Sequence, residues 1–148
     1  RRNRGARVIP FTEDVVSIAL DASASVATNA VQLANVPPGN TNVSAPLALL
    51  NRERARPDLV VIVSDSESWV DASEGATQTM QEWLLLKRRS PKAKMVCINI
   101  QPYGTTQASG RPDILNVGGF SDAVFDTIAD FAMGAAPDWV SAIDRVEV

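Results

Sequence analysis

The chain has 148 residues, of which 45% are hydrophobic and 21% are charged, as is typical of one soluble globular domain with a sizeable core. A formal net charge of −3 argues against a general nucleic-acid-binding surface, and no apolar run is long enough to span a membrane. The lack of histidine excludes Ser-His-Asp and Cys-His catalysis and any histidine-based zinc site. Cys97 falls in an apolar run, which favours a buried thiol and is compatible with a reducing, cytoplasmic location.

The chain opens with a basic run, and two short apolar runs follow it. A basic run before Gly5 is typical of the last turn of a helix. Residues 6–11 and 15–20 predict two short strands, joined by residues 12–14 into an antiparallel hairpin. Pro10 has no N–H to donate to a ladder, so we expect it at an edge or a bulge.

Two helices are predicted next. Residues 25–36 show an apolar face at helical spacing, and the Pro-Pro-Gly sequence that follows ends the helix. The members of that face are Val26, Ala30, Leu33 and Ala34. After a polar loop, residues 47–56 predict a second helix, with Ser44 as its N-cap and Pro46 in its first turn.

Residues 59–65, LVVIVSD, form the most apolar segment of the chain. This run, rich in β-branched residues, predicts a strand buried on both faces, as in a parallel sheet covered by helices. Asp65, at its carboxyl end, lies where open α/β sheets bind ligands. An alternative role for Asp65 is to cap the next turn or helix.

The C-terminal half continues the alternation of strands and helices. It predicts a helix at residues 76–89, a buried strand at 93–100, a short edge strand at 114–117, a helix at 121–133 ended by Gly134, and one short element at 139–148. The whole order predicts an α/β fold with a doubly wound, mostly parallel sheet and an antiparallel edge hairpin.

Two groups of oxygen donors match a hard divalent cation such as Mg²⁺. The first is Asp21, Ser23 and Ser25, which have the spacing DxSxS after an apolar run. The second is Thr41 together with Asp65. Caps and turns use the same side chains, so a structural role is the alternative for each.

Four stretches identify a resemblance that covers nearly the whole chain: RVIPFTEDV; PPGNTNVSAPL; PDLVVIVSDSESW; and AKMVCINI followed by DILNVGGFSDAVFDTIADF. In this order and spacing, the chain resembles the carboxyl-terminal von Willebrand factor A-like domain of the Ro (TROVE-type) ribonucleoproteins. The PPGNTNVSAPL loop and the strand that ends in SDSESW are its more specific parts.

The resemblance implies a metal-ion-dependent adhesion site (MIDAS) at the top of the sheet, with ligands from a DxSxS motif, a Thr and an Asp. Thr41 and Asp65 correspond to the last two. The family's DxSxS motif precedes a long helix and then the strand that here is residues 6–11. We therefore expect that motif upstream of Arg1, and we expect residues 1–148 to be a partial von Willebrand factor A-like domain. The segment Asp21–Ser25 is then interpreted as the start of a helix rather than a metal motif.

The absent first strand would be central in the sheet and would leave its neighbours unpaired. We therefore expect an upstream segment of the same parent, a second chain or a symmetry-related copy to supply it.

The implied function is that of a non-catalytic interaction domain in an RNA-binding protein. Ro-type proteins bind small non-coding RNAs, including Y RNAs, through a ring of helical repeats that this chain does not contain. The domain would hold Mg²⁺ or another divalent cation, to which a carboxylate of a protein partner could bind; no membrane partner is expected. Two alternatives stay open: a Mg²⁺-dependent phosphoryl-transfer enzyme, or a structural domain with an empty metal site. The enzyme would lack a Gly-rich phosphate loop, and Glu67 stands where a second Asp is expected.

Overall fold

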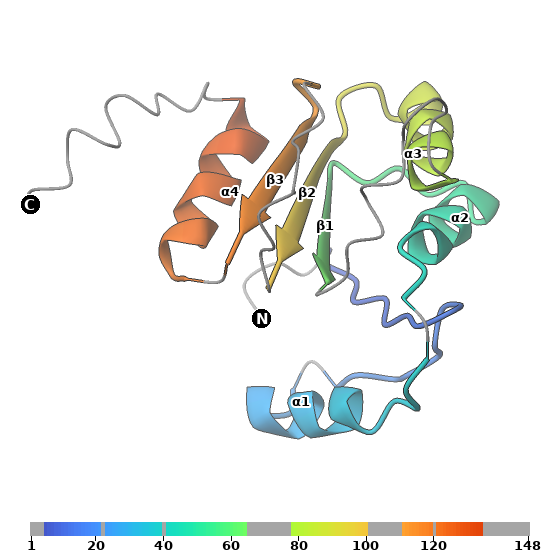
Figure 1. Ribbon diagram of the computed structural model, residues 1–148, viewed down its shortest axis with the longest axis vertical. Coiled ribbons are helices and arrows are strands. Elements are labelled where there is room, and N and C mark those ends of the chain that lie inside the picture. The colour runs from blue at the N-terminus through green and yellow to red at the C-terminus, as the bar shows by residue number, and fades with distance from the viewer. Residues whose placement is uncertain are drawn as a thin grey trace, which may run out of the picture. The chain divides into compact units, whose positions relative to one another are not determined.

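The computed structural model describes residues 5–21, 23–39, 41–64, 78–100, 111–119 and 121–134. The chain divides into two compact units, Arg1–Arg56 with Ser68–Pro91 and Pro57–Glu67 with Lys92–Val148. The first unit contains helices α1 (Val26–Ala34), α2 (Ser44–Arg52) and α3 (Gln78–Arg89). The second contains strands β1 (Leu59–Ser64), β2 (Lys94–Asn99) and β3 (Ile114–Gly118) and helix α4 (Ala123–Met133) (Figure 1). None of the helices in these described ranges is long and apolar enough to cross a membrane.

The three strands form a parallel sheet in which β2 lies between β1 and β3. Four consecutive residues of β2, Met95 to Ile98, are buried, as predicted for a central strand. The prediction of burial on both faces is wrong for β1, because Val61 is 44% exposed and Val63 is 48% exposed. Both side chains lie in the rows of Val96 and Ile98, but neither is packed against the core cluster under α4, to which β1 contributes Leu59.

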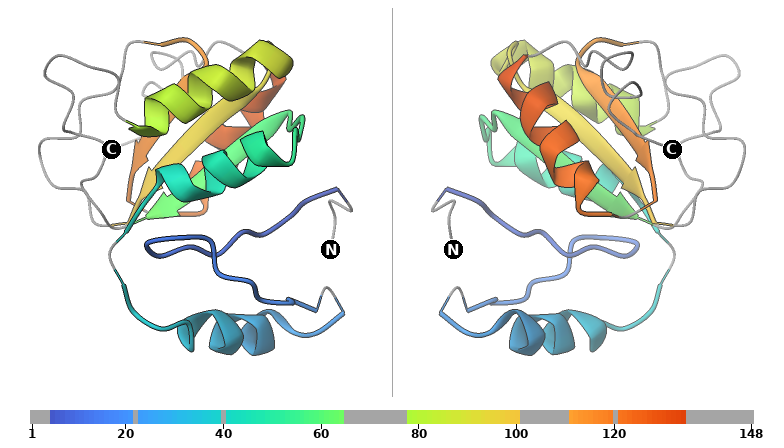
Figure 2. Two further views of the ribbon diagram at one scale, coloured as in Figure 1. Left: turned by 90° about the vertical axis from the view of Figure 1, so that its right-hand side faces the viewer. Right: turned by 90° about the vertical axis from the view of Figure 1, so that its left-hand side faces the viewer.

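Helix α4 lies across one face of this sheet (Figure 2). The core cluster there consists of Val96, Ile98, Val124 and Phe131, with Leu59, Leu115, Val117 and Ile128 packed against it. The register aligns Val96 with Leu115 and Ile98 with Val117, so apolar side chains of neighbouring parallel strands point to the same face. In α4, Val124, Ile128 and Phe131 face this cluster, whereas Ala123 is exposed.

The end of α4 is held by a glycine and a lysine. Gly134 adopts a left-handed φ of 82°, and its N–H bonds to the carbonyl of Phe131, as expected for a helix C-cap. The Lys94 ammonium donates to the same carbonyl and lies 5.0 Å from the centroid of the Phe131 ring. A cation at this position also complements the negative end of the helix dipole.

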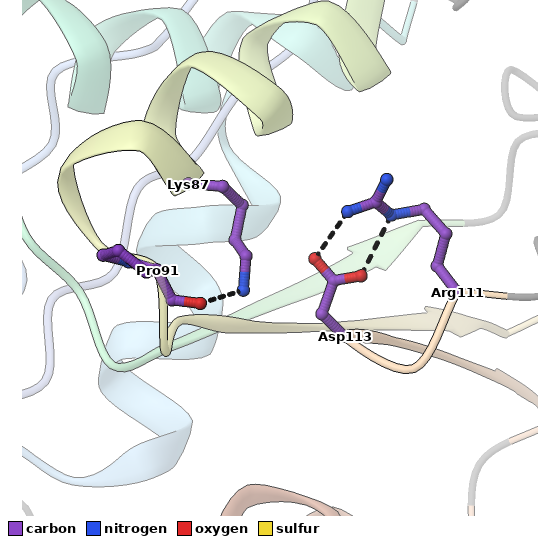
Figure 3. Close-up of polar contacts among 4 residues, drawn as sticks. All are labelled: Lys87, Pro91, Arg111 and Asp113. Carbon is purple, nitrogen blue, oxygen red and sulfur yellow. Dashed lines mark hydrogen bonds and ion pairs between the residues drawn. The ribbon is translucent and has the colours of Figure 1, made fainter.

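An ion pair fixes the start of β3. Arg111 donates to both carboxylate oxygens of Asp113, at 2.9 Å each (Figure 3). The N–H of Met95 bonds to the carbonyl of Asp113 at 2.9 Å, so this short turn is joined directly to β2. The pair raises the pKa of Arg111, chiefly through its hydrogen bond to Asp113.

Helices α2 and α3 pack side by side (Figure 2). Trp83 and Leu86 of α3 and Leu47 of α2 are fully buried, so their apolar side chains stabilise this unit. Asn51, in the last turn of α2, donates to the carbonyl of Glu82 at 2.8 Å and accepts a hydrogen bond from Arg89. This polar link therefore connects the last turn of α2 to the last residue of α3.

The predicted helix at residues 25–36 is present as α1, but its predicted inward face is wrong. No residue of α1 is buried, and Val26 is 86% exposed. The extent of α1 follows from residues at its two ends. Ser25 caps its N-terminus, and the two prolines after Val36 prevent the helix from continuing.

The predicted hairpin is reduced to its turn. Residues 6–11 and 15–20 are not strands; a single antiparallel bridge joins Phe11 and Val15. Thr12 and Asp14 close the turn through a 2.9 Å backbone bond, as expected for the connection. The ladder does not extend because Pro10 lacks a donor and the flanking residues pair with no further strand in the described ranges. The elements predicted at residues 1–4 and 139–148 lie outside those ranges.

We expect Trp83→Ala to lower the free energy of unfolding by about 3–5 kcal/mol, because it removes the largest fully buried side chain of the α2–α3 pair. Leu84→Ala is the matched control, because Leu84 is next to Trp83 in the sequence and its side chain is 41% exposed. This variant should lower the free energy of unfolding by less than about 1 kcal/mol. Urea unfolding followed by far-ultraviolet circular dichroism measures both. Equal losses would show that the buried face of α3 is assigned wrongly.

Candidate metal site

Thr41 lies in the loop between α1 and α2, and this loop packs closely on the turn at residues 12–14. The N–H of Asn42 bonds to the carbonyl of Thr12 at 2.8 Å, and its side-chain amide donates to the carbonyl of Glu13 at 3.1 Å. A Cβ on Gly39 would lie 3.2 Å from the Cβ of Thr12, so a glycine permits this close approach. Thr41 is half-buried between these two anchor points.

Asn42 also opens α2. Its side-chain oxygen accepts a 3.1 Å bond from the N–H of Ser44 and a 2.7 Å bond from the Ser44 hydroxyl. The prediction of Ser44 as N-cap is therefore wrong: Ser44 is the first residue of α2, and Asn42 satisfies its N–H. Asn42 went unnoticed in the sequence, although Asn two residues before a Ser at a helix start is a known side-chain-to-backbone turn pattern.

Asp65 lies outside the described residues, but the strand that leads to it is described. Ser64, the last residue of β1, is aligned with Asn99 of β2 and, through β2, with Gly118 of β3. The ladder continues past this row, because the N–H of Ile100 bonds to the carbonyl of Ser64 at 3.1 Å. Asp65 therefore follows the carboxyl end of a parallel strand, as predicted. That Thr41 and Asp65 share one cation stays a prediction.

The polar side chains of the DxSxS segment form hydrogen bonds within the segment and to the first turn of α1. One carboxylate oxygen of Asp21 accepts bonds from the N–H of Ser23 at 2.7 Å and from its hydroxyl at 2.6 Å, and these bonds lower the pKa of Asp21. The hydroxyl oxygen of Ser25 accepts a 3.0 Å bond from the N–H of Thr28 and caps α1. The interpretation of this segment as a helix start is supported, because Ser25 is the N-cap of α1.

The chemistry of the available donors favours oxygen ligands. Burial raises the pKa of Cys97 to about 12, so its thiol stays protonated and is neither a nucleophile nor a thiolate ligand at neutral pH. Within the described ranges, no three His, Cys, Asp or Glu residues are grouped to hold a metal ion. Thr41 is thus the one predicted ligand that these ranges contain, and its hydroxyl suits a hard cation.

We expect Asn42→Ala to destabilise the protein by about 1–3 kcal/mol, because it removes the acceptor that bonds the N–H and the hydroxyl of the buried Ser44. Asn35→Ala, at an exposed position in the same loop region, should change stability by at most about 0.5 kcal/mol. Thermal unfolding measures the two variants in parallel. If Asn42→Ala is as mild as Asn35→Ala, the anchoring of the Thr41 loop by this side chain is refuted.

Comparison with known proteins agrees with this architecture. The structure is similar to the crystal structure of the Deinococcus radiodurans Ro (RSR) protein, with a TM-score of 0.67 and 19% sequence identity over 85% of this chain. At this identity the likeness establishes the fold, and the chain spans 25% of the length of that protein. No curated protein sequence matches the chain significantly. The family model described as the Ro60 vWA domain matches residues 1–132, and the chain therefore belongs to the Ro60 von Willebrand factor A domain family.

Proposed function

We propose that this chain is a non-catalytic interaction domain of a Ro-type RNA-binding protein and that Thr41 and Asp65 are ligands of its divalent cation. The observation that carries the proposal is the family match over residues 1–132, which includes both residues. Thr41 lies in the loop before α2, and Asp65 follows β1 in the sequence.

The donor chemistry supports Mg²⁺. A hydroxyl and a carboxylate are hard ligands, and Mg²⁺ is usually held by few protein oxygens while it keeps several waters. The Thr41 loop is tied to the turn at residues 12–14 and to the start of α2, so its hydroxyl is positioned before an ion binds. Further oxygen ligands come from another segment or chain. When bound, the cation supplies an electrophilic position to which a partner's carboxylate can bind.

The RNA partner belongs to the whole protein. We infer that small non-coding RNA is bound mainly by other parts of a cytoplasmic Ro-type protein. The net charge of −3 on this chain supports that division of roles. Under this proposal the domain joins a protein partner to an RNA-binding body through its metal site.

Thermal unfolding of the full-length protein with Mg²⁺ or with EDTA tests the metal ligands. A ligand that binds only the folded state stabilises it by about 2.7 kcal/mol at one hundred times its dissociation constant. We expect Mg²⁺ to raise the unfolding temperature of the wild type, and Asp65→Ala and Thr41→Ala to abolish this rise whatever their effect in EDTA.

Asp21→Ala is the control, because Asp21 is a carboxylate bonded within its own turn. It should leave the Mg²⁺-dependent rise unchanged. A rise that survives in Asp65→Ala but disappears in Asp21→Ala would assign the cation to the DxSxS segment and overturn the proposal.

A further inference from the structure

Basic side chains gather where the packed helices α2 and α3 end. The last turn of α2 and the residues just after it contain three arginines, Arg52, Arg54 and Arg56. The last turn of α3 consists of Lys87, Arg88 and Arg89. We call these six residues the basic end. The bond between Asn51 and Arg89 joins the last turn of one helix to that of the other, so both runs lie at the same end of the pair.

One carboxylate next to α2 and one within α3 are already engaged. Glu53 forms an ion pair with Arg7, and the hydrogen bond from Arg7 lowers the pKa of Glu53, which keeps it ionised and paired. The Glu82 carboxylate accepts a 2.5 Å bond from Asn51. The six cations of the basic end outnumber these two carboxylates, so the basic end carries an excess of positive charge.

Two of the six cations have structural roles. Lys87 donates to the carbonyl of Pro91 (Figure 3). Its ammonium also lies 5.8 Å from the centroid of the Trp83 ring. Arg89 is half-buried and bonded to Asn51. The other four, Arg52, Arg54, Arg56 and Arg88, are exposed. No carboxylate of the described ranges forms an ion pair with Arg54, Arg56 or Arg88.

The backbone at Arg54 is unusual for an arginine. Its φ is 55°, and it is the only residue other than glycine with positive φ in the described part of the chain. The N–H of Arg54 bonds to the carbonyl of Asn51, and that of Ala55 bonds to the carbonyl of Leu50, which together form the helix-ending motif that usually places glycine here. Glycine would adopt this backbone conformation with less strain than arginine does. The presence of arginine is therefore explained better by a role of its side chain.

We propose that the basic end is a binding surface for the phosphodiester backbone of RNA. Four exposed arginines at one end of two packed helices match a chain of phosphates, because the planar guanidinium bonds two oxygens of a phosphate at once. The net charge of the whole chain does not argue against a local surface, since attraction at physiological salt falls off within about 8 Å. The choice of RNA over an acidic peptide rests on the proposed function.

The test is the binding of a fluorescent single-stranded oligouridylate to the full-length protein, measured by anisotropy at several KCl concentrations. The variant Arg54→Gly with Arg56→Gln and Arg88→Gln should bind at least about tenfold more weakly at low salt, with a salt slope smaller by about two, as expected for three lost contacts to single-stranded phosphates. Because glycine suits a left-handed φ, the variant should also melt no lower than the wild type.

The charge-matched control replaces Arg1, Arg2 and Arg4 by glutamine and should bind as the wild type does. Equal binding by wild type and basic-end variant would overturn the RNA surface and leave the metal proposal untouched. Equal losses in variant and control would also overturn it, because net charge alone would then explain binding. Displacement of RNA by polyglutamate at equal charge would show an acidic-peptide site instead. If the wild type binds no RNA, both the RNA part of the proposed function and this surface fail.

Discussion

Parallel pairing of β2 with both of its neighbours is the constraint on which the second unit depends. The register places Val61, Val96 and Leu115 side by side on one face, which α4 then covers over β2 and β3. The same register aligns Ser64 with Asn99, so polar side chains gather where the strands end. The strands are parallel, so their carboxyl ends lie at the same edge of the sheet. The same hydrogen-bond register therefore aligns the apolar core residues and the polar residues that precede Asp65 in the sequence.

The first unit depends on a single neutral side chain in a comparable way. Asn42 uses its donor toward Glu13 and its acceptor toward Ser44, and its backbone N–H bonds to Thr12. The turn at residues 12–14 and the start of α2 are thus held together beside Thr41. A hydroxyl presented by such a loop has little conformational freedom left to lose, so an ion bound there would not have to order the loop.

The two proposed surfaces use opposite ends of α2. Thr41 precedes its first turn, and the exposed arginines follow its last turn. A helix of nine residues is about 13 Å long, which separates the proposed ligand Thr41 from the basic end by more than one Debye length at physiological salt. Binding at one end therefore need not weaken binding at the other. Under the two proposals, a protein carboxylate and an RNA backbone would bind at separate ends of this helix.

The sequence by itself determined the order of helices and strands from Val26 to Gly134, the parallel sheet and the burial of Cys97. These follow from local causes: β-branched apolar runs, helical spacing, and glycine or proline at the ends of elements. It also located Thr41 before a helix and Asp65 after a strand.

Only the tertiary structure decided which predicted apolar faces are buried. Val26 and Val61 look like core residues in the sequence, yet both are exposed, because burial depends on what packs against a face and a residue pattern does not contain that information. The structure alone also showed that Asn42 rather than Ser44 satisfies the start of α2, and that two basic runs more than thirty residues apart meet at one end of a helix pair. Such contacts join segments distant in the chain, and local composition and spacing do not specify them.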